Sequence, residues 1–142
     1  MIAGSLVRFR RLRAEQRRYL VKASVLLGFA SAAVALLPFR YAIRFGCVPL
    51  SARYPRLAEQ ADIVWAVQAA ARRLPWRTMC IEQGIVAQRM LRSIGVEALL
   101  HYGARNDAMS GKLAAHVWVS AGGASLIGGE EASAFREIAT FP

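Results

Sequence analysis

The sequence has few of the residues that build disulfide-rich or metal-binding proteins. Its 142 residues include two cysteines, Cys47 and Cys80, and two histidines, His101 and His116. Two cysteines do not make a disulfide framework, although a single disulfide between them stays open. No Cys-x-x-Cys or His-x-x-x-His spacing joins these residues into a zinc site. We therefore expect neither a metal ion nor another cofactor.

Phosphate-binding loops and acidic residues are scarce as well. The Gly-Gly pairs at 122–123 and 128–129 are typical of hairpins and not of a nucleotide-binding loop. Nine acidic residues stand against 19 lysines and arginines, but seven of the basic side chains lie within residues 1–22. Because the positive charge is concentrated in this short segment, we do not expect the domain to bind nucleic acid.

No apolar run is long enough to be a clear transmembrane helix. Residues 23–39 form an apolar run of 17 residues, shorter than the roughly 20 that cross a bilayer. Residues 5–21, just before it, have the pattern of a basic amphipathic helix. We expect the apolar helix to pack against the domain or a partner, with a spanning or an interfacial helix as alternatives. No secretory cleavage pattern follows, so we expect a cytoplasmic protein whose membrane contact, if any, is made by residues 5–39.

The rest of the chain changes from a helical to a β pattern at Gly95, after a linker over residues 40–56. Helical periodicity and strand alternation predict the elements that follow. These are helices 57–73 and 79–94, strands 96–102, 113–120 and 124–127, a polar loop over 103–112, and a short helical or irregular end over 128–142. This order predicts an α+β fold, with N-terminal helices followed by a small antiparallel sheet. We divide it into a helical segment, 1–50, and a domain, 51–142.

Cys80 lies at the predicted start of a helix, with Thr78 as a plausible N-cap. The free N–H groups and the dipole of a first turn favour a thiolate, the nucleophilic form of cysteine. Gly84, Ala87 and Leu91 share the face of Cys80, and a face of small residues lets another element approach closely. The alternative is that Cys80 is a small buried hydrophobe, as most lone cysteines in apolar helices are.

His116 lies in the strongest predicted strand, on the same face as Trp118. We expect this face to turn towards the cysteine helix, so that the imidazole can take the thiol proton and pass it to a leaving amine. A third group usually orients such an imidazole. Glu130, with Glu131 as the alternative, follows the neighbouring strand, and Asp107 is a weaker choice because it lies in the loop. A purely structural histidine stays open.

Three segments together resemble the lasso-peptide leader peptidases, which correspond to the C-terminal half of McjB-type maturation proteins and form a transglutaminase-like cysteine protease family. The segments are RTMCIEQGIVAQRMLRSIGVEALLHYGAR, AAHVWVSAGGASLIGGEE and FREIATFP. The resemblance implies a papain/transglutaminase-like fold, with Cys80 as nucleophile, His116 as base and an acid near Glu130 as the orienting group. The family often has Asp at that place, whereas this chain has Gly129-Glu130-Glu131.

The resemblance also implies a reaction and its partners. The enzyme would remove the leader from a ribosomally made precursor, and a separate cyclase resembling asparagine synthetase would close the ring. Fused members carry a leader-recognition domain, so we expect recognition by a separate small protein here. Two alternatives remain, which are acyl transfer to an amine and a non-catalytic adaptor in the maturation complex.

Overall fold

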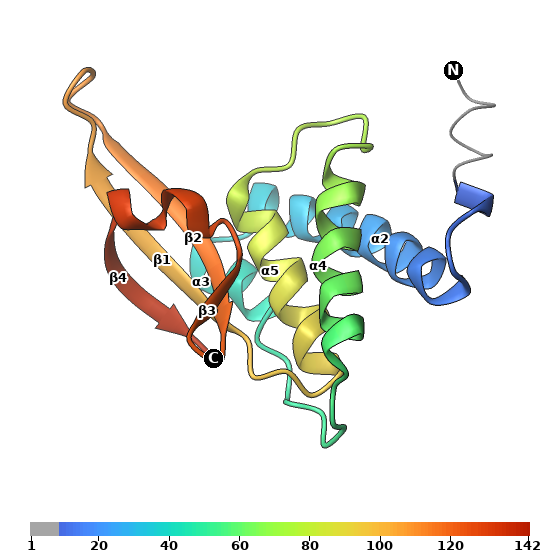
Figure 1. Ribbon diagram of the computed structural model, residues 1–142. Coiled ribbons are helices and arrows are strands. Elements are labelled where there is room, and N and C mark those ends of the chain that lie inside the picture. Colours follow the sequence, from blue (N-terminus) through green and yellow to red (C-terminus); the bar gives the residue numbers. More distant parts are fainter. Residues whose placement is uncertain (1–8) are drawn as a thin grey trace.

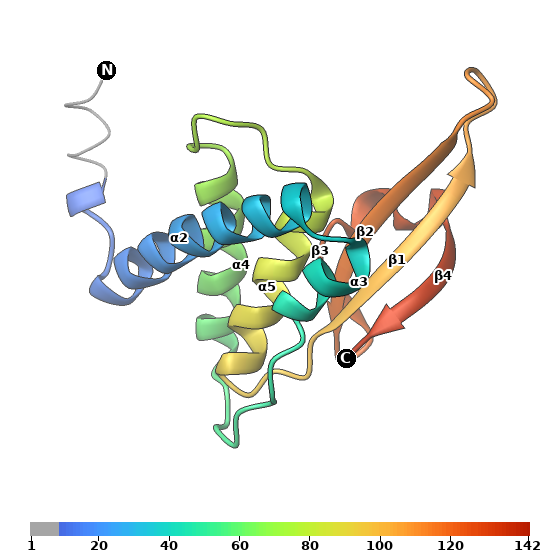
Figure 2. The same ribbon diagram turned by 180° about the vertical axis from the view of Figure 1, so that it is seen from behind.

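Three long helices lie on one side of a four-stranded antiparallel sheet in the computed structural model, which describes residues 9–142 (Figures 1 and 2). The helices are α2 (Ala14–Leu36), α4 (Leu57–Ala71) and α5 (Cys80–Ser93), with the short α3 (Phe39–Ala42) and η1 (Ile43–Phe45) between the first two. The sheet has the order β3-β2-β1-β4, from β1 (Leu99–Asn106), β2 (Leu113–Ala121), β3 (Ala124–Ile127) and β4 (Arg136–Phe141). The 3₁₀ helix η2 (Gly129–Ala134) connects β3 to β4. The chain therefore has the predicted α+β fold.

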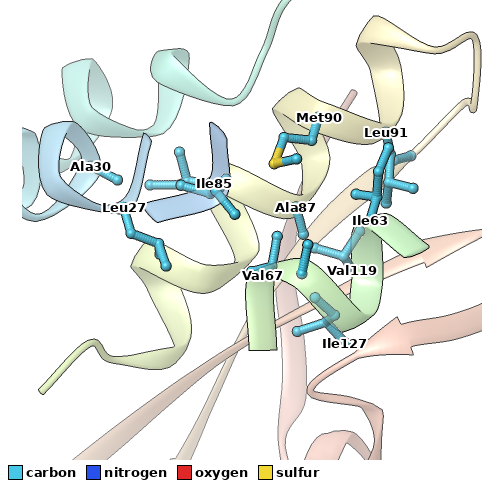
Figure 3. Packing of buried hydrophobic residues seen from close by; sticks show 14 of the residues in the cluster. Leu27, Ala30, Ile63, Val67, Ile85, Ala87, Met90, Leu91, Val119 and Ile127 are labelled. Carbon is cyan, nitrogen blue, oxygen red and sulfur yellow. The ribbon is translucent and has the colours of Figure 1, made fainter. Parts of the chain in front are cut away.

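Helix α5 lies between the sheet and α4, and it carries the centre of the core (Figures 1 and 3). Ile85, Ala87, Met90 and Leu91 are fully buried. The close approach to the sheet depends on Gly84, where an added Cβ would lie 2.7 Å from Cγ1 of Val117. Gly84, one residue of the small-residue face predicted for this helix, therefore lies against β2.

Helix α2 is one continuous helix of 23 residues, and this corrects the prediction of two helices that meet at Lys22. Residues 5–8 of the predicted basic helix lie outside the described residues. Lys22 is exposed, so its charge does not interrupt the helix. Leu20, Ala23, Leu27 and Ala30 are buried in the same cluster as residues of α4 and α5. The division at residue 50 stays a prediction, and the described core extends across it.

Ion pairs and hydrogen bonds tie α2 to α4. Arg13 donates two hydrogen bonds to the buried carboxylate of Asp62, at 2.7 and 2.8 Å. The hydroxyl of Tyr19 donates to the carboxylate of Glu59, which is also buried and accepts from Arg53 at 3.2 Å. The Tyr19 hydrogen bond, together with the Arg53 charge, lowers the pKa of Glu59. Burial and the nearby Glu59 raise the pKa of Tyr19 to about 12.

Replacing Glu59 with glutamine is expected to lower the free energy of unfolding by about 1–3 kcal/mol at pH 7, because Arg53 and Tyr19 lose a charged acceptor. Since the folded pKa of Glu59 is depressed, its contribution is present above roughly pH 4.3, the unfolded value, and is lost as the pH falls through the folded value. Urea unfolding at pH 7 and in acid checks this. A difference between the two proteins that stays equally large in acid would contradict it.

The other predicted elements are mostly where the sequence pattern placed them. Helices α4 and α5 end within two residues of their predicted ends, and Gly95 follows α5 with a φ of +91°. Strands β2 and β3 are confirmed, whereas β1 begins at Leu99 and continues to Asn106, into the predicted loop. The predicted linker contains α3 and η1. Strand β4, which pairs with β1, was not predicted.

Candidate functional site

Cys80 is the first residue of α5 and is half-buried against the hydrophobic core. The N-cap is Met79, in extended conformation, and not Thr78 as predicted. The Glu82 carboxylate accepts a hydrogen bond from the backbone N–H of Met79, which closes the start of the helix. The first-turn N–H groups have no acceptor within an α-helix. They can therefore stabilise a thiolate on Cys80 or an oxyanion that forms beside it.

A polar cleft of about 400 Å³ lies beside this helix start. Thr78 and Gln83, which lie on either side of Cys80 in the sequence, line it together with Arg72 and Arg77. The side-chain amide of Gln83 donates a hydrogen bond to the backbone carbonyl of Thr78 at 3.3 Å and so connects these two lining residues. The cleft is thus bordered by residues on both sides of Cys80 in the sequence.

Both cysteines are free thiols, and their surroundings differ. Cys47 donates a hydrogen bond to the carbonyl of Ile43, with 3.5 Å between sulfur and oxygen. Burial raises the pKa of the Cys47 thiol, which disfavours its thiolate. The position of Cys80 at a helix start is therefore the better one for a nucleophile.

His116 is held by a backbone carbonyl. Its Nε2 lies 2.7 Å from the carbonyl oxygen of Gly128, and its ring packs against Phe135 with 5.0 Å between centroids. Because a carbonyl oxygen can only accept a hydrogen bond, Nε2 carries the proton, and the lone pair of the neutral ring is on Nδ1. Gly128 follows the last residue of β3, so the ring lies where β3 stops pairing with β2. His116 is thus oriented with Nδ1 available as a base.

The side of β2 on which His116 lies differs from the predicted one. Val117 and Val119 are the β2 side chains that meet α5 at Gly84. His116 and Trp118 alternate with them, and Trp118 packs on Gly103 on the side of the sheet away from α5. Among residues 9–142, no hydrogen bond joins Cys80 to His116. The predicted sharing of a face with Trp118 is confirmed, whereas that face does not turn towards the cysteine helix.

The predicted orienting acids do not contact His116. Glu130 and Glu131 are exposed in η2, and neither side chain forms a hydrogen bond with another described residue. Asp107 accepts hydrogen bonds from Ser110 and Met109 within the turn between β1 and β2. The acceptor at His116 is the Gly128 carbonyl, a group that no side-chain pattern reveals. The catalytic roles of Cys80, His116 and Glu130 stay predictions.

Replacing Gly128 with alanine is expected to lower turnover at least about 10-fold, because misplacing the base weakens proton transfer. Gly128 has a φ of +73°, and an added Cβ would lie 2.8 Å from the Val117 carbonyl oxygen, so the loop that holds His116 must move. Glu130→Gln is the matched control, with an expected change below about threefold for an exposed group without a partner. Comparing kcat/KM of the two variants checks this, and a larger loss in Glu130→Gln would restore Glu130 as the orienting group.

His101 is the centre of a second cluster, which the sequence did not reveal. Its Nε2 lies 2.7 Å from Oγ of Ser120 on β2, and its Nδ1 lies 2.9 Å from the Glu137 carboxylate on β4. Thr140 also donates to Glu137, and the two hydrogen bonds contribute to a lowered pKa of that carboxyl. This connectivity is that of a serine–histidine–acid relay, and it also clamps β1 to both neighbours. This cluster could not be predicted from the sequence because β4, which supplies Glu137, was not predicted.

One of three comparisons with known proteins finds a family for this chain. The family model described as the transglutaminase-like superfamily matches residues 23–140. Neither the curated proteins nor the solved structures gave a match. The match runs from within α2 to within β4 and includes both cysteines and both histidines. On this evidence the chain belongs to the transglutaminase-like superfamily, whose domain is compatible with cysteine peptidase or acyltransferase activity.

Proposed function

We propose that this chain is a cysteine peptidase that removes the leader from a ribosomally made lasso-peptide precursor. The observation that carries the proposal is the place of Cys80, a half-buried free thiol at the first turn of the central helix of a transglutaminase-like domain. The resemblance of the segments around Cys80, His116 and the C-terminus to leader peptidases supplies the substrate class. A separate recognition protein presents the leader, and an asparagine-synthetase-like cyclase uses the freed core.

The proposed mechanism proceeds through a thioester. His116 takes the proton of the Cys80 thiol, and the thiolate attacks the carbonyl carbon of the scissile bond. First-turn N–H groups of α5 stabilise the oxyanion of the tetrahedral intermediate. The C–N bond then breaks, the imidazolium gives its proton to the leaving amine of the core, and the leader acyl group remains on Sγ. Water, deprotonated by His116, hydrolyses the thioester and releases the leader carboxylate.

This mechanism requires the His116 imidazole to come within hydrogen-bond reach of Sγ in the reacting complex. Catalytic hydrogen bonds are often long or poorly aligned before substrate binds. The ring lies where β3 stops pairing with β2, with Nε2 on the Gly128 carbonyl. Because His116 lies on the face of β2 away from α5, we expect substrate binding to be accompanied by a rearrangement of β2 and the segment after β3 that carries the ring to the side of Cys80.

Acyl transfer is the second candidate, because an amine can capture the same thioester in place of water. We expect incubation of the full chain with precursor, recognition protein and cyclase to yield a free leader carboxylate and a core with a free or cyclised N-terminus. Mass spectrometry of the products separates the candidates. A leader joined to an added amine would replace hydrolysis with transfer, and an uncleaved precursor in the complete mixture would favour the adaptor.

A further inference from the structure

Helix α2 has a second apolar face that nothing in the described chain covers. Four large side chains on it are exposed, namely Val21 at 53%, Val25 at 54%, Phe29 at 62% and Leu36 at 80%. At about 100° per residue, these positions cluster on one side of the helix. The buried residues Leu20, Ala23, Leu27 and Ala30 lie on the opposite side. We call the four exposed residues the outer stripe.

The outer stripe lies along α2, which crosses in front of α4 and α5 in Figure 2. From Val21 to Leu36 it is about 22 Å long. Leu37, Phe39 and Tyr41 continue the exposed apolar surface past the end of the helix. Trp76 is also exposed, but its Nε1 donates to Ser31, which lies nearer the buried side of α2, so it is not part of the outer stripe.

Basic side chains lie at both ends of the outer stripe. By the same helical spacing, Arg18 and Lys22 occupy the stripe side at its N-terminal end, and both are exposed. Arg40 and Arg44 follow its C-terminal end and are also exposed. Among residues 9–142, no ion pair engages any of these four side chains. Arg40 packs over the ring of Tyr41, and its charge stays available to solvent. An exposed apolar stripe with cations at both ends is complementary to an anionic lipid surface.

We propose that the outer stripe binds the surface of an anionic lipid bilayer, with α2 lying in the plane of the interface. The helix is long and apolar enough to cross a membrane, but its inner face is part of the core and Arg13 is paired with Asp62. A spanning α2 would have to leave both, whereas an interfacial α2 keeps them. The proposal uses no catalytic residue and does not depend on the proposed function.

Sedimentation of the full chain with phosphatidylcholine vesicles, with and without phosphatidylglycerol, tests this proposal. We expect binding to the anionic vesicles only, weakened by salt. Phe29→Glu is expected to reduce binding at least about 10-fold, because a carboxylate replaces an inserted ring. Lys22→Gln should reduce it by about fivefold, the effect of one basic residue near an anionic surface. Leu113→Glu, at an exposed apolar site on the sheet, is the matched control and should bind as the parent chain does.

Circular dichroism of each variant confirms that it is folded, which we expect because the substituted side chains are exposed. Three results would overturn the proposal. They are no sedimentation with anionic vesicles, an equal loss in Leu113→Glu and Phe29→Glu, and a change from dimer to monomer in Phe29→Glu without any lipid binding. The last result would assign the outer stripe to a second copy of the chain.

Discussion

Replacing Cys80 with alanine is expected to abolish precursor cleavage, with a loss of at least about 10⁴-fold in turnover. No other group can form the thioester if Cys80 is the nucleophile. The folded state should survive, since Cys80 is only half-buried and such a change alters stability by about 1 kcal/mol or less. Product formation by mass spectrometry and thermal unfolding are the two measurements.

Cys47→Ala is the matched control for this prediction. Cys47 is also a partly buried free thiol, but burial raises its pKa and the thiol donates a hydrogen bond to the Ile43 carbonyl. We expect this variant to keep the activity of the parent chain. Equal losses in the two variants would indicate that both cysteines are structural, and cleavage by Cys80→Ala would remove Cys80 from the mechanism.

Replacing Gly84 with valine is expected to destabilise the protein by about 4 kcal/mol or more, at the upper end of single substitutions. Its first carbon alone would lie 2.7 Å from Val117 Cγ1 and 3.4 Å from Leu100 Cδ1. Helix α5 would have to move away from the sheet, and Cys80 would move with it. Urea unfolding measures the loss, and activity should fall in parallel.

Gly28→Ala is the control for the helical backbone. Gly28 is in the interior of α2, and an added Cβ there meets no atom within 4 Å. Alanine should therefore stabilise the protein by up to about 1 kcal/mol through its higher helix propensity. If Gly84→Val and Gly28→Ala changed stability alike, close packing of α5 on β2 would not be what Gly84 provides.

The elements with strong periodicity could be predicted from the sequence. Strand β2 alternates through Val117 and Val119, and Gly95 marks the end of α5. Strand β4 could not, because it is an edge strand whose side chains are mostly exposed, including Ile138. It is held by pairing with β1, and such a partner is distant in the sequence. The single α2 was missed because the charge of Lys22 suggests a boundary between two helices. A charged residue can also lie on the exposed face of one continuous helix, as Lys22 does.

The candidate site, like the fold, could be predicted from the sequence only in part. Cys80 could be placed at a helix start from local sequence alone. Alternation gave His116 and Trp118 a common face, but both faces of β2 carry apolar side chains, so the pattern could not tell which face α5 covers. The Gly128 carbonyl and the His101 cluster are contacts between distant segments. A sequence pattern does not reveal a backbone acceptor or a contact made by a strand that was not predicted.

The position of acylation by a small activated ester tests the central claim, which is that Cys80 is the acyl-transfer nucleophile. The intact chain is exposed to p-nitrophenyl acetate at neutral pH, and peptide mass spectrometry locates the acetyl group. We predict a thioester on Cys80 in the parent chain and no acetylated thiol in Cys80→Ala. Acetylation of Cys47 or of Ser120, the hydroxyl bonded to His101, with Cys80 left unmodified would contradict the account.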